Sequence, residues 1–163
     1  IRDFCLSRGL GDVYKRQNMK IMLINGPNLN LLGQREVDIY GSKTLNEIED
    51  NLKNIAHKEN AELICFQSNS EGEMIDQVHD ALDLNVQFIL INPAAYTHTS
   101  IALRDAFLST SIPFYEVHIT DINDREDFRK ISYLQDIAQK SFIGHGVKGY
   151  EIALLHAIKE MRT

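Results

Sequence analysis

From Met19 onward, apolar runs of strand length alternate with segments whose apolar residues recur at helical spacing. The runs are rich in Val, Ile, Leu and Phe, which is typical of strands covered on both faces. They predict strands at 20–25, 61–68, 86–92, 112–118 and 140–144. The segments between and after them predict helices at 44–59, 71–84, 98–110, 124–131 and 147–162.

This alternation predicts an α/β fold, with a parallel sheet between two layers of helices and right-handed crossovers. Two helix starts carry further signals, because Thr44 with Glu47 and Ser70 with Glu73 have the spacing of capping boxes. The usual strand order for such a chain is 2-1-3-4-5, that of a flavodoxin-like three-layer sandwich. We therefore expect a ligand site at the carboxyl ends of the strands, where the strand order reverses.

The chain has 163 residues, of which 44 % are hydrophobic, and this size suits one core. We expect one domain at 19–163. Residues 1–18 lack a periodic apolar face, and their segment "SRGLGDVYKRQ" resembles sequencing-adapter read-through. We interpret 1–18 as a non-native or disordered leader, with a genuine targeting extension as the alternative.

Charge and composition narrow the range of partners. The formal net charge of -6 argues against nucleic acid as a partner, because proteins bind its phosphates through clustered Lys and Arg. The sequence has no apolar run of about 18 residues, so we expect no membrane partner. Cys5 and Cys65 form no disulfide framework, which suits a reducing compartment, and we expect a cytoplasmic protein. The six histidines show no metal-ligand spacing, so no metal site is predicted.

The loop after the first predicted strand, "INGPNLNLLGQREVDIYG", has an unusual composition. Pro27 fixes a turn, and Asn28 and Asn30 tolerate the backbone angles that turns need, so a structural role alone would explain them. Gly33 and Gly41 bracket the second half of the loop, as expected of a hinged flap.

This flap carries Arg35 and Tyr40. A phenol has a reference pKa of about 10 and works as a base near neutral pH only if a neighbouring cation stabilises its anion. Arg35 is a candidate for that cation and Tyr40 for the base. The alternatives are a solvated surface charge for Arg35 and a ring packed at the core edge for Tyr40.

The third and fourth predicted strands also end in polar residues. Asn92 and His98 flank a loop in which a helix beginning near His98 would direct free backbone N–H groups at an anion. The alternative for His98 is a role in capping the helix or in supporting another site residue without touching the ligand. His118 ends the fourth strand, and Glu116 lies on the same side, where it could orient the imidazole and favour its protonated form. Such a histidine suits a general acid, whereas a backbone carbonyl partner is the structural alternative.

The segment "GHGVKG", residues 144–149, matches the spacing of a dinucleotide fingerprint. No further strand follows it to supply the acidic residue that would hold a ribose. We therefore interpret its glycines as a tight turn and close helix packing.

Several longer blocks together resemble one family, type II 3-dehydroquinate dehydratase, from about Met19 to Met161. They are "NGPNLNLLGQREVDIYG", "QSNSEGEMID", "INPAAYTHTSIALRDA", "FYEVHITDINDREDFRKISY" and "GHGVKGYEIAL". The resemblance implies a flavodoxin-like subunit, a homo-oligomeric dodecamer built as a tetramer of trimers, and no cofactor. It also implies reversible trans-dehydration of 3-dehydroquinate to 3-dehydroshikimate, through an enolate, in the shikimate or quinate pathway.

The resemblance further implies a role for individual residues. Tyr40 matches the base, Arg35 the arginine that keeps it reactive, His118 the acid and Asn28 the residue that holds a water against the enolate oxygen. The matches to the substrate-binding set are Asn92, His98, Ile119, Thr120 and Arg129, with Asp105 reaching a neighbouring subunit's site. The family commonly has Ser at the position of Thr120, for which we expect an altered fit at most.

Two other classes of function stay open at this point. A non-enzymatic module that binds a nucleotide or phosphate would explain the sheet and the glycines, although not Arg35 with Tyr40 on one flap. An inactive homologue kept for assembly is the other.

Overall fold

The computed structural model describes residues 19–34 and 36–163. Its centre is a five-stranded sheet with the order β2-β1-β3-β4-β5, in which every neighbouring pair is parallel. The strands are β1 (Met19–Asn25), β2 (Ala61–Gln67), β3 (Phe88–Asn92), β4 (Phe114–His118) and β5 (Lys140–Ile143). The predicted strand order is therefore confirmed, and each strand lies within two residues of its predicted bounds.

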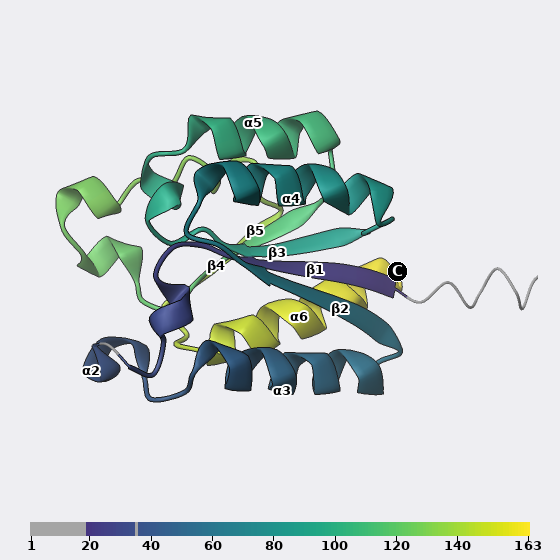
Figure 1. Ribbon diagram of the computed structural model, residues 1–163, viewed down its shortest axis with the longest axis horizontal. Coiled ribbons are helices and arrows are strands. Elements are labelled where there is room, and N and C mark those ends of the chain that lie inside the picture. The colour runs from purple at the N-terminus through teal and green to yellow at the C-terminus, as the bar shows by residue number, and fades with distance from the viewer. Residues whose placement is uncertain (1–18, 35) are drawn as a thin grey trace, which may run out of the picture.

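Helices cover both faces of the sheet, as Figure 1 shows. One face carries α3 (Leu45–Lys58) and α6 (Lys148–Met161), and the other carries α4 (Glu71–Asp83) and α5 (Ile101–Thr110). Successive residues of β1 alternate between the two cores: Ile21 and Leu23 pack with α3 and α6, while Met22 and Ile24 pack with α4 and α5. Burial on both sides is the reason that β1 and β3 are apolar along most of their length.

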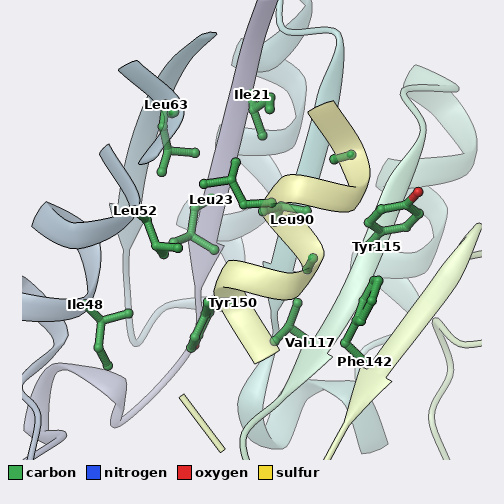
Figure 2. Packing of buried hydrophobic residues seen from close by; sticks show 14 of the residues in the cluster. Ile21, Leu23, Ile48, Leu52, Leu63, Leu90, Tyr115, Val117, Phe142 and Tyr150 are labelled. Atoms are coloured by element: carbon green, nitrogen blue, oxygen red, sulfur yellow. The ribbon is translucent and has the colours of Figure 1, made fainter. Parts of the chain in front are cut away.

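The first of these cores is seen from close by in Figure 2, where Leu52 of α3 and Leu23 of β1 lie near one another. Helix α3 begins as predicted, because Thr44 and Glu47 form both hydrogen bonds of a capping box. At α4 only half of the predicted box forms. The Ser70 hydroxyl accepts from the Glu73 N–H, but the Glu73 carboxylate bonds the Ser68 hydroxyl instead.

Two predicted helices differ from the structure. The helix expected at 124–131 is wrong: the segment forms the 3-10 turns η3 (Ile122–Asp124) and η4 (Asp127–Arg129). The Asp121 carboxylate caps the first turn by accepting from the Asn123 N–H at 2.9 Å, which competes with a continuous helix. The helix expected from residue 98 begins only at Ile101, after the 3-10 turn η2 (Ala94–His98).

The loops at the carboxyl ends of the strands gather at one edge of the sheet, on the left of Figure 1. They include η1 (Leu29–Leu31), the short helix α2 (Val37–Tyr40) and the three 3-10 turns named above. The glycines of "GHGVKG" form the predicted turn, since Gly144 and Gly146 have φ of 77° and 61°. Among the described residues, no helix has the length and apolar character needed to cross a membrane.

Candidate active site

A cavity of about 380 Å³ opens at the carboxyl edge of the sheet. It brings together most of the residues predicted from the sequence, although they come from three separate loops. The predicted residues that line it are Asn28, Tyr40, Asn92, His98, His118, Ile119, Thr120 and Arg129. Arg35 lies outside the described residues, and Asp105 does not line this cavity.

The turn after β1 is held in place by the neighbouring loops. The Gly26 N–H donates to the Asn92 carbonyl at 2.8 Å, and the Asn28 N–H donates to Oδ1 of Asn69 at 2.9 Å. Asn28 has φ of 67°, a left-handed conformation that asparagine tolerates better than most residues. The external hydrogen bonds therefore fix a backbone conformation that presents Asn28 at the rim of the cavity.

The flap places Tyr40 in the cavity wall. Gly33 and Gly41, which bracket the flap, both have positive φ, at 81° and 87°. The Tyr40 hydroxyl accepts a hydrogen bond from Nη1 of Arg125 at 3.3 Å, and the same nitrogen lies 3.5 Å from Oγ1 of Thr120. The bond from Arg125 to Tyr40 raises the pKa of this guanidinium above its ordinary value. A cation therefore lies against the phenol.

Arg125 lines the cavity, although the sequence does not predict it as a site residue. The available signal was the segment "DINDREDFRK", in which Arg125 and Arg129 follow the fourth strand. Within that segment nothing distinguishes a cavity arginine from a surface one, because the flap and this loop are far apart in the sequence.

Asn92 is the last residue of β3, and both the oxygen and the nitrogen of its side-chain amide form hydrogen bonds. Its Oδ1 accepts from the Ala94 N–H at 3.2 Å, and its Nδ2 donates to the Tyr150 hydroxyl at 2.7 Å. Ala94 has φ of 50°, which is uncommon for a residue with a side chain. The Asn92 side chain thus stabilises the strained start of the loop that forms one wall of the cavity.

His98 lies at the end of η2 rather than in the first turn of a helix, so the predicted helix start near His98 is wrong, and the anion site proposed at that helix end stays a prediction. The N-cap of α5 is the buried Ser100, whose hydroxyl accepts from the Leu103 N–H at 2.9 Å. Nδ1 of His98 lies 2.6 Å from the Ile131 carbonyl. Burial lowers the pKa of His98, although this carbonyl opposes the shift. A carbonyl can only accept, so Nδ1 carries the proton and Nε2 can accept from a ligand hydroxyl.

His118 and Glu116 form the pair predicted at the end of β4. Nε2 of His118 lies 2.7 Å from Oε1 of Glu116, whose side chain is 0 % exposed. An ionised carboxylate only accepts, so Nε2 donates, which leaves Nδ1 as the ring nitrogen that can serve a ligand. The alternative of a backbone carbonyl partner for His118 is not what the structure has.

Two hydroxyl groups also donate to Glu116. Oγ of Ser132 lies 2.7 Å from Oε1, and the Thr97 hydroxyl bonds the same oxygen. Burial alone would raise the pKa of Glu116, but the hydrogen bonds from His118, Thr97 and Ser132 together hold it below its ordinary value. The carboxylate is therefore kept as an anion beneath the imidazole.

Asp105 lies on the exposed side of α5, away from the cavity of its own chain. No group of three or more His, Cys, Asp or Glu among residues 19–34 and 36–163 is arranged to hold a metal ion. The described cavity therefore offers an imidazole with a buried carboxylate, a phenol with a guanidinium, and amide groups, which are the side chains of acid–base chemistry.

Fold and cavity together define a flavodoxin-like α/β protein whose cavity at the strand carboxyl ends contains an imidazole–carboxylate pair and a phenol–guanidinium pair. Residues 19–158 match the family described as "Dehydroquinase class II". The chain belongs to this family.

Similar proteins agree with this membership over nearly the whole chain. The 3-dehydroquinate dehydratase of Psychromonas ingrahamii is 53 % identical over 147 residues, which cover 90 % of this chain and 98 % of that protein. The enzyme of the same name from Histophilus somni is 55 % identical over 138 residues, covering 85 % and 91 %. The crystal structure of type II dehydroquinase from Butyrivibrio crossotus superposes with a TM-score of 0.83 at 42 % identity, over 90 % of this chain and 99 % of that one.

Proposed function

We propose that this protein catalyses the reversible trans-dehydration of 3-dehydroquinate to 3-dehydroshikimate, as a hydro-lyase of the shikimate or quinate pathway. Its family and its relatives named 3-dehydroquinate dehydratase support the reaction. The observation that carries the proposal is one cavity lined by both Tyr40 and His118, with Arg125 on the phenol and Glu116 on the imidazole. A non-enzymatic phosphate module would not need either pair.

Tyr40 acts as the base in this mechanism. As its anion, it removes a proton from the carbon next to the ketone, and the electron pair of the broken C–H bond forms an enolate. Arg125 stabilises the phenolate, because an opposite charge at hydrogen-bond distance favours the ionised form. Arg35 of the same flap is proposed as a second cation, as its position in the family blocks suggests.

The enolate then collapses and expels the hydroxyl group on the next carbon. His118, protonated and paired with Glu116, gives its Nδ1 proton to that group, which leaves as water. Asn28 supports the negative oxygen of the enolate through a bound water. The proton taken by Tyr40 and the one given by His118 balance, and exchange with solvent resets both groups.

The remaining residues of the cavity wall hold the substrate. Neutral Asn92 and His98 suit the ring hydroxyls, with Nε2 of His98 as an acceptor. The backbone at Ile119 and Thr120 and the guanidinium of Arg129 suit the carboxylate. Nε of Arg129 also forms an ion pair with Oε2 of Glu126 at 3.0 Å. The substrate carboxylate would therefore compete with Glu126 for the guanidinium.

We also propose that the active form is a homo-oligomer, a dodecamer in which Asp105 contributes to a neighbouring subunit's site. Asp105 lies on α5 between Ile101 and Leu108, which are 57 % and 53 % exposed. The three residues share one helix face by their spacing. An exposed apolar face around a carboxylate suits a subunit interface. Sedimentation or light scattering that gave a monomer would remove this role of Asp105.

The direct test incubates the purified protein with 3-dehydroquinate and follows the ultraviolet absorbance of the conjugated enone product. Wild-type protein should generate the enone catalytically and reach the same equilibrium from 3-dehydroshikimate. Absence of turnover, with nucleotide binding in a parallel titration, would overturn the proposal and favour the binding module. Absence of both would favour an inactive homologue.

A further inference from the structure

Tyr150 of α6 is a fully buried tyrosine that the proposed mechanism does not use. It is 0 % exposed, and it extends from the helix toward β1 in Figure 2. It follows directly after the "GHGVKG" segment, whose glycines had only a structural interpretation. Its hydroxyl lies between the last residues of the two central strands, Asn25 of β1 and Asn92 of β3, which are register partners in the sheet.

The hydroxyl joins these two asparagines in a directed chain of hydrogen bonds. Nδ2 of Asn92 donates to the Tyr150 oxygen at 2.7 Å, and the Tyr150 hydroxyl donates to Oδ1 of Asn25 at 2.9 Å. Nδ2 of Asn25 then donates to Oε1 of Glu49 on α3 at 3.2 Å. The direction of the chain is set at Asn92, because the Ala94 N–H can only donate and therefore holds Oδ1 of Asn92, which leaves Nδ2 to face the Tyr150 hydroxyl.

The chain ends at the cavity. Asn92 lines it, whereas Tyr150 and Asn25 lie behind it and do not. With Oδ1 of Asn92 on the Ala94 N–H and one proton of Nδ2 on Tyr150, the amide cannot flip without losing both bonds. What Asn92 can offer a substrate is then its second Nδ2 proton and the remaining acceptor capacity of Oδ1.

We propose that Tyr150 is a positioning residue for substrate binding, which fixes the orientation of the Asn92 amide through its hydroxyl. This inference rests on the function proposed above for the same cavity. It assigns the buried tyrosine a role beyond packing: the phenol ring fills the core, while the hydroxyl determines which face of the Asn92 amide meets the ligand.

The test compares Tyr150→Phe with Tyr115→Phe. Tyr115 is a matched control, because it is 1 % exposed, its hydroxyl bonds Glu160, and it does not line the cavity. For Tyr150→Phe we expect KM for 3-dehydroquinate to rise about tenfold with kcat changed less than about threefold, the size expected for one lost hydrogen bond. Tyr115→Phe should leave KM within about twofold of wild type, a change too small to amount to a lost hydrogen bond. Equal KM values for the two variants would overturn the proposal.

A double-mutant cycle separates positioning from general loosening of the core. If Tyr150 acts through Asn92, adding Tyr150→Phe to Asn92→Ala should raise KM no further than Asn92→Ala alone. Additive effects would overturn the proposal. Should Tyr150→Phe fail to fold, Asn25→Ala removes the acceptor of the same hydroxyl; an increased KM would support the role and a wild-type KM would refute it.

A measurement without substrate keeps this inference distinct from the proposed function. In ¹⁵N-labelled protein, the side-chain amide protons of Asn92 should exchange slowly with solvent in wild type and in Tyr115→Phe, and quickly in Tyr150→Phe. If wild-type protein does not turn over 3-dehydroquinate, the proposed function fails while this measurement still reports on the hydrogen bond. Fast exchange in wild type would refute the orientation itself.

Discussion

Arg125 donates a hydrogen bond to the hydroxyl of Tyr40 across 85 residues of sequence, with Nη1 3.3 Å from the phenolic oxygen. The contact joins the flap after β1 to the loop after β4. It also places a guanidinium on the group proposed as the base, from a segment that does not belong to the flap. The charge needed to favour a phenolate is therefore present in the cavity independently of Arg35.

Substitution of Arg125 tests this charge. Arg125→Gln keeps a hydrogen-bond donor but removes the cation, so the phenolate loses its stabilisation. We expect kcat/KM to fall by about 10- to 100-fold, corresponding to about 1.4–2.8 kcal/mol of lost transition-state stabilisation. Steady-state kinetics with 3-dehydroquinate at a fixed pH would measure this loss.

Arg125→Lys is the matched control, since it keeps the charge without the planar guanidinium. It should retain more activity than Arg125→Gln. Equal kcat/KM values for wild type and Arg125→Gln would mean that the hydrogen bond has no part in activating Tyr40.

Tyr40→Phe tests the base itself. The ring is half-buried at the core edge, so the fold should survive loss of the hydroxyl. Because one well-placed proton transfer is typically worth about 10²- to 10⁴-fold in rate, kcat should fall by at least about 100-fold. Tyr133→Phe is the control, because Tyr133 is 38 % exposed and does not line the cavity, and its kcat should match wild type. Near wild-type turnover by Tyr40→Phe would disprove the assignment.

Glu116→Gln tests the buried carboxylate beneath His118. The variant keeps the size of the side chain but removes the anion that pairs with Nε2 at 2.7 Å. The imidazole then loses its charged hydrogen-bond partner, so we expect kcat to fall at least about tenfold, or about 1.4 kcal/mol of transition-state stabilisation. Steady-state kinetics at a fixed pH near neutrality would measure this loss.

The same variant should change the acid sensitivity of folding. The pKa of Glu116 in the folded protein lies below its ordinary value of 4.5, so the ionised carboxylate stabilises the fold above about pH 4.5. This contribution is lost as the pH falls through the folded-state pKa. Urea unfolding should therefore find Glu116→Gln less stable than wild type at pH 7, with a difference that shrinks toward pH 3. A constant difference would contradict the lowered pKa.

The strands of the sheet were predictable because burial on both faces requires runs of apolar residues, which can be recognised in the sequence. Residues Ile21 to Ile24 are each 0 % exposed, and such a run has no alternation that could be mistaken for an amphipathic element. His118 and Glu116 were also predictable, since two residues along a strand place side chains on the same side. The contact between these two residues can therefore be predicted without knowing how any other segment packs.

The contacts that the sequence did not reveal depend on distant segments or on local competition. Arg125 meets Tyr40 only because the β1 and β4 loops converge, and no local pattern records this. Asp121 and Ser100 alter the predicted helices through side-chain hydrogen bonds to nearby backbone, which compete with helical periodicity. Tyr150 was missed because a tyrosine in a helix next to glycines indicates packing, and its two asparagine partners are 58 and 125 residues away.

Gly26 provides a steric test of how the central loops hold the cavity together. A Cβ atom there would lie 2.5 Å from the Pro93 carbonyl oxygen and 2.7 Å from its carbon, both of which are backbone atoms. Gly26→Ala must therefore push apart the turn after β1 and the loop after β3, which the bond from the Gly26 N–H to the Asn92 carbonyl now joins at 2.8 Å.

We expect Gly26→Ala to lower the free energy of unfolding by about 1–3 kcal/mol, the usual cost of overpacking. It should also reduce kcat/KM, because Asn28 and Asn92 lie on the two displaced segments. Gly72→Ala in α4 is the control: its Cβ would meet only Oγ of Ser70 at 3.9 Å. That variant should be as stable as wild type or more stable by up to about 1 kcal/mol, because alanine favours a helix over glycine. Urea unfolding and enone formation, measured on both variants, test this prediction. Unchanged stability and activity in Gly26→Ala would mean that the two loops can separate without loss of stability.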